Sequence, residues 1–399
     1  MNKVTLGMIC EASKNLEGII RKTPLIAVKS VNPNLFLKAE NLQETGSFKI
    51  RGAYNKISSL TDEELSKGII ACSSGNHSQG VALSSSIKNV SSVICMPKDA
   101  PLIKIKKTKS YGSEVILVPG VYDDASLMAQ KLAEEKDYTL IHPFDDPFVI
   151  AGQGTIGLEI VQQLPDVEQV IVPIGGGGLI SGISVAVKSL KPECKIIGVQ
   201  PTGIPSMYGS MKANKILSVP DANTIADGVH VLKPGKLTFE LVKEYVDDIV
   251  TVDEDEICAA IVTLLESSKT ITEGAGATSL AAFMFDKVDT SKKTVCLLSG
   301  GNVDTYNLER IVTKGLIKLG RLFNLEVELD DNTKALATLL NILAETDAGS
   351  IDIVKKYFSF NNNIKKYSFI FSIETFGEKH IKEITEILKE KGYSFKVLS

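Results

Sequence analysis

The sequence predicts an α/β protein with two domains of open, twisted parallel sheet and a smaller C-terminal domain. Three observations predict this architecture. Short apolar β-rich runs alternate with helical patterns from about residue 68 to 142, and a second such series begins near 169 and ends with TVCLLSG at 294. After Gly320 the order becomes βαββαβ, the split arrangement of a ferredoxin-like module. At 399 residues the chain also exceeds one compact core.

These patterns also predict where the domains begin and end. We expect a large domain from residues 1–40 and 143–320, a small α/β domain at 41–142, and a third domain at 321–399. The six cysteines are scattered singly, which supports neither a disulfide framework nor a zinc site.

Composition and charge exclude several classes of protein. The net charge of −4 comes from well-mixed Lys and Glu, so we expect no nucleic-acid partner. No apolar run approaches the length of a membrane span, and the first residues lack the apolar core of a secretory signal, which predicts a cytoplasmic protein. The one basic run, IKIKKTK at 103–109, is interpreted as the solvated face of a helix.

Lys49 lies in the segment SFKIRGA, directly after Phe48 and at the start of a predicted helix. A lysine that forms a Schiff base must lie where its charge is disfavoured, near apolar groups at a strand-to-helix junction. A single lysine near a helix start is ordinarily a surface cation. The interpretation of Lys49 therefore depends on three further motifs.

The first of these, Ser73-Ser74-Gly75-Asn76-His77, follows the apolar run GIIAC and opens a helix. Its N–H and hydroxyl groups face the carboxyl end of a strand, where a substrate carboxylate would bind. The Asn76 amide can donate to a phenolate oxygen or simply cap the helix. His77 has no carboxylate partner close in sequence, so we favour a structural role for it over that of general base.

The second motif is a glycine loop, Gly175-Gly176-Gly177-Gly178, followed by Leu179 and placed between the run QVIVPI and a predicted helix. Without side chains, several backbone N–H groups can converge on one phosphate at the positive end of the helix. The loop lacks the spacing of a dinucleotide fingerprint and the Gly-Lys-Ser/Thr ending of a P-loop. We therefore predict a cradle for a single phosphate.

The third motif, Leu298-Ser299-Gly300-Gly301-Asn302, ends the apolar strand TVCLL, where a hydroxyl faces the ligand crevice of an open sheet. In this order, the motifs resemble the serine/threonine dehydratases of the tryptophan-synthase-like (fold type II) group of pyridoxal-phosphate enzymes. The resemblance extends over residues 5–318 and includes Ala226-Asp227-Gly228 and the segment TEGAGA at 272–277. It implies a large domain that binds pyridoxal 5′-phosphate.

The resemblance also implies roles for individual residues. Lys49 would hold the cofactor as a Schiff base, with Phe48 packed on the pyridine ring. Asn76 would contact the 3′-oxygen, Ser299 would meet the pyridine nitrogen, and the backbone N–H groups of Gly175 to Leu179 would hold the phosphate. Ser74 is implied as the acid/base on the face opposite Lys49, and the implied substrate-binding residues are Ser73, Ser74, Gly75, Asn76, His77 and Gln153.

The hydroxyl of Ser299 predicts the reaction type, because it tempers carbanion stabilisation and so favours loss of a β-leaving group over transamination. We expect L-threonine to yield 2-oxobutanoate and ammonium, and L-serine to yield pyruvate. Two alternatives are a serine racemase or serine dehydratase, which shares SFKIRGA and SSGNH, and an effector-binding regulatory protein with a degenerate dehydratase core. Gln200 and Ser206 stand where some relatives have acidic metal ligands, so no metal site is expected.

The tail at 321–399 resembles a single ACT regulatory domain, a module that commonly binds amino acids between paired subunits, and fits the medium-length form of these dehydratases. Thr333 and Lys334 replace the Pro-Gly pair that often precedes the first helix of this module. Without that glycine, the backbone cannot approach an effector so freely. An amino-acid or nucleotide effector and a dimerisation role both stay open, and a homodimer or homotetramer is expected.

Overall fold

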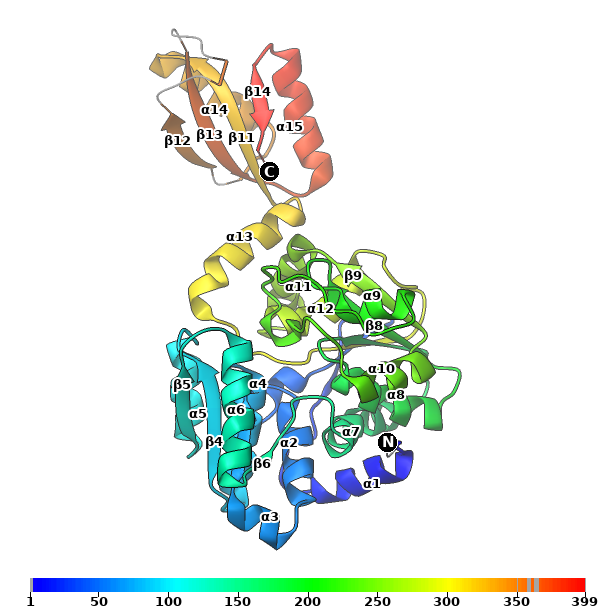
Figure 1. Ribbon diagram of the computed structural model, residues 1–399. Coiled ribbons are helices and arrows are strands. Elements are labelled where there is room, and N and C mark those ends of the chain that lie inside the picture. Colours follow the sequence, from blue (N-terminus) through cyan, green and yellow to red (C-terminus); the bar gives the residue numbers. More distant parts are fainter. Residues whose placement is uncertain (1–2, 350, 357–359, 362–365, 399) are drawn as a thin grey trace. The chain divides into compact units, whose positions relative to one another are not determined.

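The computed structural model describes residues 3–349, 351–356, 360–361 and 366–398, and it divides the chain into two compact units, Met1–Asp304 and Thr305–Ser399 (Figure 1). The predicted α/β class is confirmed. The predicted third domain begins at residue 321, whereas the second compact unit begins at 305, because α13 (Leu308–Lys318) is grouped with the strands that follow it. The short 3₁₀ helix η3 (Thr305–Asn307) precedes α13.

The first unit contains a six-stranded sheet whose parallel part carries buried, nearly continuous apolar strands. Its strand order is β1-β2-β10-β7-β8-β9, and only the β1–β2 pair is antiparallel. Such strands require cover on both faces. The strands are β1 (Leu25–Ala27), β2 (Leu35–Lys38), β7 (Gln169–Pro173), β8 (Lys195–Pro201), β9 (Asp248–Val252) and β10 (Thr294–Leu297).

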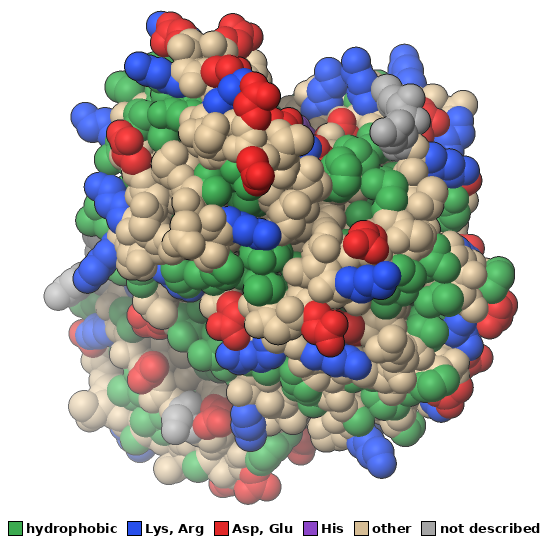
Figure 2. All heavy atoms as spheres, turned by 90° about the horizontal axis from the view of Figure 1, so that it is seen from below, with side chains coloured by type: hydrophobic (Ala, Val, Ile, Leu, Met, Phe, Trp, Pro, Cys, Tyr) green, Lys and Arg blue, Asp and Glu red, His purple; other side chains and the backbone are tan. Residues whose placement is uncertain are grey.

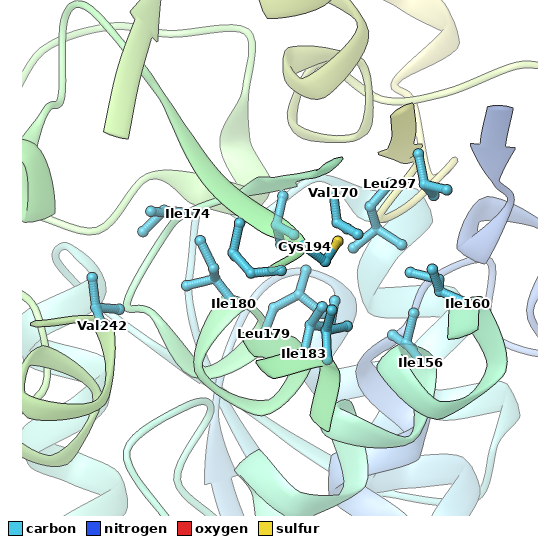
Figure 3. Packing of buried hydrophobic residues seen from close by; sticks show 14 of the residues in the cluster. Ile156, Ile160, Val170, Ile174, Leu179, Ile180, Ile183, Cys194, Val242 and Leu297 are labelled. Atoms are coloured by element: carbon cyan, nitrogen blue, oxygen red, sulfur yellow. The ribbon is translucent and has the colours of Figure 1, made fainter. Parts of the chain in front are cut away.

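Helices cover both faces of this sheet. On one face, α7 and α8 form a common apolar cluster with the strands, to which Ile156, Ile183 and Val170 belong (Figure 3). On the opposite face, α12 packs against β7, β8 and β10. The helices of this part are α1 (Leu6–Asn15), α7 (Pro147–Gln163), α8 (Gly178–Leu190), α9 (Ser206–Lys212), α10 (Lys236–Tyr245), α11 (Glu254–Ser267) and α12 (Gly274–Met284), with 3₁₀ helices η1 (Glu40–Leu42) and η2 (Asp227–Val229).

A second, four-stranded sheet of the same unit has the order β5-β4-β3-β6, and all its pairs are parallel. Alternate residues of β3 and β4 face opposite sides: Ile69 and Ile94 lie in the cluster with α2 and α5, whereas Ile70 and Cys95 pack against α6. Its elements are β3 (Ile69–Cys72), β4 (Ser92–Pro97), β5 (Glu114–Val118), β6 (Thr139–Leu140), α2 (Lys49–Ser58), α3 (Asp62–Lys67), α4 (Asn76–Ile87), α5 (Leu102–Ser110) and α6 (Tyr122–Lys136). The domain boundaries at 40/41 and 142/143 stay a proposal.

Helix α7 crosses α2 at van der Waals contact of the two backbones. A Cβ atom on Gly152 of α7 would lie 2.4 Å from the carbonyl oxygen of Arg51. Because no side chain fits there, glycine permits the close crossing. The crossing holds α2, which begins at Lys49, against the six-stranded part of the unit.

A buried ion network fixes the same helix. The fully buried Arg51 donates from Nε and Nη2 to Glu40, each at 2.8 Å, and from Nη1 to Glu159 at 2.7 Å. Lys38, also fully buried, donates to Glu159 at 2.5 Å. Burial alone would lower the pKa of Arg51, but Glu40 and Glu159 raise it, so the guanidinium stays charged.

The second unit forms the predicted βαββαβ arrangement. Its sheet has the order β12-β13-β11-β14, with every pair antiparallel. The strand predicted around 350–360 falls partly outside the described residues, which omit 350 and 357–359. The elements are β11 (Leu322–Asp330), α14 (Thr333–Glu345), β12 (Ile351–Lys356), β13 (Lys366–Glu374), α15 (Glu378–Glu390) and β14 (Phe395–Val397).

Replacing Arg51 with Met should lower the free energy of unfolding by about 3 to 5 kcal/mol, because Glu40 would keep a buried charge without its cation and Glu159 would keep only Lys38 as a partner. Urea unfolding followed by circular dichroism measures the loss. Lys3→Met, which removes the exposed pair between Lys3 and Glu244, serves as the control and should leave the midpoint nearly unchanged. Equal midpoints for the two variants would contradict the role assigned to the network.

Candidate active site

A cavity of about 870 Å³ lies at the carboxyl ends of β3, β7 and β10 in the first unit. Three of the predicted motifs follow these strands directly, and Lys49 enters the same cavity from the start of α2. This is where open parallel sheets bind ligands. All the predicted site residues line this cavity: Phe48, Lys49, Ser73, Ser74, Gly75, Asn76, His77, Gln153, Gly175, Gly176, Gly177, Gly178, Leu179 and Ser299.

The Lys49 amine is held at the cavity wall. Its Nζ donates to the carbonyl oxygen of Pro143 at 3.0 Å and lies 5.2 Å from the centre of the Phe48 ring. Burial among protein atoms lowers the pKa of Lys49 to about 8, against an opposing attraction from Glu273. An amine with this pKa is readily available in its neutral form near pH 8.

The backbone of the glycine loop leaves no room for side chains at Gly176 and Gly177. Gly177 has φ +99°, which favours glycine, and a Cβ atom on Gly176 would lie 2.4 Å from the Phe144 ring. Within the described residues, the backbone N–H groups from Gly175 to Leu179 donate no hydrogen bond. These N–H groups begin the 13-residue helix α8, so the loop suits an anion of the size of a phosphate.

The serine-rich loop and Ser299 lie on other walls of the cavity. Ser73 Oγ accepts the Gly75 N–H at 3.1 Å, which holds the loop at the start of α4. Ser299 is buried, and its carbonyl oxygen accepts the Phe48 N–H at 3.1 Å, so the strand end that carries the hydroxyl is tied to the segment that carries Lys49. Ser74 is partly exposed to the cavity.

His77 and Gln153 are almost fully buried, and both are engaged by the protein. His77 Nε2 lies 2.9 Å from the Ile141 carbonyl oxygen and therefore carries the proton of a neutral ring. Gln153 Oε1 accepts the Gly52 N–H at 3.1 Å. Burial lowers the pKa of His77 to about 3, and the nearby Lys49 adds to this effect. Such a ring is a poor base, as the structural interpretation of His77 expects.

Sequence reasoning missed Glu273 as a site residue, although its segment TEGAGA was noted. Glu273 precedes α12 and accepts a hydrogen bond from Asn76 Nδ2 at 2.6 Å. Burial raises the pKa of Glu273 to about 6, in spite of the neighbouring Lys104. The partners are 197 residues apart, so no local pattern could join them.

The segment HPFDDP at 142–147 was missed as well. His142 Nδ1 accepts the N–H groups of Phe144 and Asp145, at 3.2 and 2.8 Å. The turn so formed presents the Pro143 carbonyl to Lys49 and the Phe144 ring to the glycine loop. Asp146 caps α7, directly before a proline, and this capping signal could have been read from the sequence.

The interpretation of the basic run as a solvated helix face was wrong for two of its lysines. Lys104 of α5 lines the cavity and lies 3.4 Å from Asp227, and Lys107 donates to Asn302 at 2.9 Å. Lys106 and Lys109 of the same helix are exposed. The helical period places Lys104 and Lys107 on one side of α5, a side that packs inward here.

The positions corresponding to metal ligands are occupied by neutral side chains with protein partners. Gln200 Nε2 donates to the Ile174 carbonyl, its Oε1 accepts the Tyr208 N–H, and Ser206 Oγ donates to the Val231 carbonyl. Across the described ranges, no group of three or more His, Cys, Asp or Glu side chains is arranged to hold a metal ion.

Basic and acidic side chains are interspersed over much of the face shown in Figure 2. No helix in the described part of the chain is both long and apolar enough to span a membrane.

Comparison with known proteins agrees with this geometry. The family model described as pyridoxal-phosphate dependent enzyme matches residues 16–300. An L-threonine ammonia-lyase from Thermotoga maritima is 46% identical over 400 residues, covering 99% of this chain and 100% of that protein. Threonine deaminase isoform 2 from Solanum lycopersicum is 38% identical, with a TM-score of 0.74 over 77% of this chain and 86% of that chain. Maize serine racemase is 35% identical, with a TM-score of 0.74 over 79% of this chain and 99% of that chain.

The low pKa of His77 makes part of the stability dependent on pH. Below pH 6.5 the unfolded chain takes up a proton at this ring, whereas the folded chain does not until about pH 3. The corresponding stability is present above pH 6.5 and is lost as the pH falls, by up to about 1.4 kcal/mol per pH unit.

His77→Gln, which keeps an N–H donor for the Ile141 carbonyl, should therefore flatten the acid side of the stability profile. Urea unfolding at several values between pH 4 and pH 7 gives the two profiles. Parallel profiles for the variant and the unmodified protein would show that His77 does not titrate in this way.

Proposed function

The chain belongs to the family of pyridoxal-phosphate dependent enzymes, and on that premise we propose that it is a threonine ammonia-lyase. It converts L-threonine to 2-oxobutanoate and ammonium, and L-serine to pyruvate. The observation that carries the proposal is the shared cavity, in which the Lys49 amine, the glycine loop and the Ser299 hydroxyl meet. The named relative from Thermotoga maritima, similar over 99% of the chain, supports threonine as the substrate.

The residues of the cavity fit pyridoxal phosphate. The free N–H groups of Gly175 to Leu179 would hold its phosphate, and Lys49 would provide the amine that binds it. Phe48 would pack on the pyridine ring, Asn76 would donate to its 3′-oxygen and Ser299 would meet the ring nitrogen. When bound, the cofactor supplies an electron sink that stabilises negative charge at the substrate Cα.

The protein groups then account for the elimination. Once the amine of L-threonine has taken the place of Lys49, the freed Lys49 amine, with its pKa of about 8, removes the Cα proton at a pH near neutrality. The Cβ–O bond breaks, and the hydroxyl takes up a proton, equivalent to the one removed from Cα, and leaves as water. The released enamine becomes an imine, and hydrolysis of this imine gives 2-oxobutanoate and ammonium. Ser73, Ser74 and Gly75, at the start of the 12-residue helix α4, bind the substrate carboxylate, and Ser74 serves as acid/base on the opposite face.

Ser299 favours elimination over transamination. A carboxylate at this place would keep the ring nitrogen protonated and strengthen the electron sink, whereas a hydroxyl donates to a neutral nitrogen. The Cα carbanion is therefore less stabilised, and rapid loss of the β-hydroxyl competes well with the protonation that would lead to transamination.

The two alternatives are less well supported. The similarity to maize serine racemase keeps racemisation and serine dehydration as rivals, but Gln200 and Ser206 leave no acidic pair for a divalent metal. A regulatory protein with a degenerate core is disfavoured, because every residue expected for the chemistry lines one cavity. Comparison of kcat/KM for L-threonine, L-serine and D-serine distinguishes a threonine ammonia-lyase from a serine dehydratase or a serine racemase.

Lys49→Ala should remove the visible absorbance of the bound cofactor and lower ketoacid formation by about 10³-fold or more. Absorbance spectroscopy and a coupled ketoacid assay measure the two effects. Lys49→Arg keeps the positive charge but not the primary amine, so it should be equally inactive. Turnover by either variant with normal absorbance would sink the assignment of Lys49.

The second unit is proposed as an ACT-like assembly domain in a homodimer or homotetramer. At the start of α14, where this module commonly binds effectors, Asn332 already accepts the Ala335 N–H at 2.8 Å, and Thr333 and Lys334 follow it. Binding of an amino-acid or nucleotide effector is therefore the less favoured role of this unit. A cytoplasmic location is part of the same proposal and depends on the sequence pattern.

Isoleucine, valine and AMP should accordingly leave the initial rate with L-threonine unchanged, because the first turn of α14 offers no glycine for close backbone approach. Initial rates and light scattering, each with and without the three compounds, provide the test. A change of rate or of oligomer size with any of them would show that the tail, residues 321–399, has a regulatory role.

A further inference from the structure

Four side chains form a continuous line of hydrogen bonds beside the cavity. Lys107 Nζ donates to Asn302 Oδ1 at 2.9 Å, and Asn302 Nδ2 donates to Asn76 Oδ1 at 2.7 Å. Asn76 Nδ2 in turn donates to Glu273 Oε1 at 2.6 Å. The line joins α5, the loop after β10, the start of α4 and the residue before α12.

The charges at the two ends fix the direction of both amides. An ammonium group can only donate, so the oxygen of Asn302 must face Lys107, and its nitrogen then faces Asn76 and the Thr45 carbonyl at 2.9 Å. A carboxylate can only accept, so the nitrogen of Asn76 must face Glu273. Chains of this kind polarise one another, which strengthens each bond.

Among the residues that the structure describes, this arrangement leaves one polar hydrogen of Asn76 without a partner. The Nδ2 group carries two hydrogens, and the bond to Glu273 uses one of them. Asn76 lines the cavity, so the remaining N–H is available to a ligand there. If the amide turned over, an oxygen would face the same position and repel an anionic ligand atom.

Glycines make room for the line at three points. A Cβ atom added to Gly46 would lie 2.6 Å from Asn302 Oδ1. Cβ atoms added to Gly228 and Gly300 would lie 3.0 and 2.4 Å from Glu273 Oε1. Any larger residue at Gly46 or Gly300 would force the amide or the carboxylate to move. The backbone is thus fitted to these side chains, which is not expected of incidental surface contacts.

The Glu273 carboxyl group has a mixed electrostatic environment. Lys104 and Lys107 of α5 and Lys49 of α2 favour its ionised form, whereas Asp227 of η2 and its own burial disfavour it. Lys107 therefore acts on Asn76 in two ways, through Asn302 and through the charge of Glu273.

We propose that Lys107, Asn302 and Glu273 are positioning residues that hold the Asn76 amide with an N–H directed at the anionic oxygen of the bound cofactor. The inference rests on the proposed function, because it takes Asn76 as the partner of the 3′-oxygen. Lys107 contacts no substrate or cofactor atom in this proposal and acts on Asn76 through Asn302 and through the charge of Glu273. Lys107 belongs to the basic run at 103–109, and the fold brings it next to the cavity.

Lys107→Met tests the proposal with little risk to folding, because the lysine is a half-buried surface side chain. Lys106→Met is the matched control, since it removes one positive charge from the exposed side of the same helix. Both variants are loaded with pyridoxal phosphate and titrated with acid and base without substrate. The pH midpoint of the cofactor's visible absorbance is the first readout, and kcat/KM for L-threonine is the second.

Lys107→Met should raise the absorbance midpoint by about half a pH unit, because a weaker donor stabilises the anionic oxygen less, and should lower kcat/KM about tenfold. Lys106→Met should change neither quantity. Lys107→Arg, which keeps a cationic donor, should restore most of both. Identical midpoints for Lys107→Met and Lys106→Met would overturn the proposal, even if the enzyme turns over threonine normally.

A double-mutant cycle with Asn76→Ala gives a stricter test. If Lys107 acts through Asn76, then Lys107→Met should have almost no further effect on the midpoint or on kcat/KM in the Asn76→Ala background. Additive effects would show that Lys107 acts by another route and would overturn the proposal. The absorbance titration needs no turnover, so failure of the proposed reaction and failure of this inference are distinguishable.

Discussion

The position of Lys49 depends on the buried charge of Arg51, two residues further along α2. Arg51 reaches Glu40, next to the six-stranded sheet, and Glu159, in the C-terminal half of α7, through four donor contacts of 2.7 to 3.1 Å. Replacing all four charged residues, Arg51, Lys38, Glu40 and Glu159, with neutral residues of similar volume would avoid the cost of burying their charges, so net stability is a weak explanation for the network. The network instead fixes the orientation of α2. It allows a single rotation and depth of α2, and the amine at its first residue is thereby placed opposite the glycine loop.

Close backbone packing carries this constraint to the rest of the cavity. Gly152 lets α7 touch α2, and a Cβ atom on Gly182 of α8 would lie 2.3 Å from the carbonyl oxygen of Ile150 in α7. The three helices are therefore in direct backbone contact, and α8 begins at Gly178 of the glycine loop. The distance between a phosphate in that loop and the Lys49 amine is set by helix contacts, not by flexible segments. The turn at 142–146 adds a second link, since Pro143 touches Lys49 and Phe144 fills the space beside Gly176.

Local patterns predicted the parts of the site that lie next to strands. The apolar runs before Ser73, Gly175 and Ser299 each mark a parallel strand, and parallel strands bring their carboxyl ends to one edge, so the shared cavity followed from strand order. The same logic predicted the α/β class and the βαββαβ tail. It could not find Glu273 or Asn302 as neighbours of Asn76, or Lys107 as a neighbour of Asn302, because these pairs are 197, 226 and 195 residues apart and meet only through tertiary packing. For Lys107, the helical period allowed two faces, and only the fold decides which one is buried.

The electrostatics of the site follow from the same packing. Burial lowers the pKa of Lys49 to about 8 and raises that of Glu273 to about 6, so each group is shifted toward the neutral form it would not hold in water near pH 7. The two attract each other when charged, and this attraction limits both shifts. Any loss of the Lys49 charge would weaken that attraction and favour protonation of Glu273. The hydrogen bond to Asn76 opposes this, since it stabilises the carboxylate. Asn76 thus connects the Glu273 carboxylate, through Asn302, to the Lys107 ammonium of α5, and the electrostatics of the cavity depend on side chains from four separate segments of the chain.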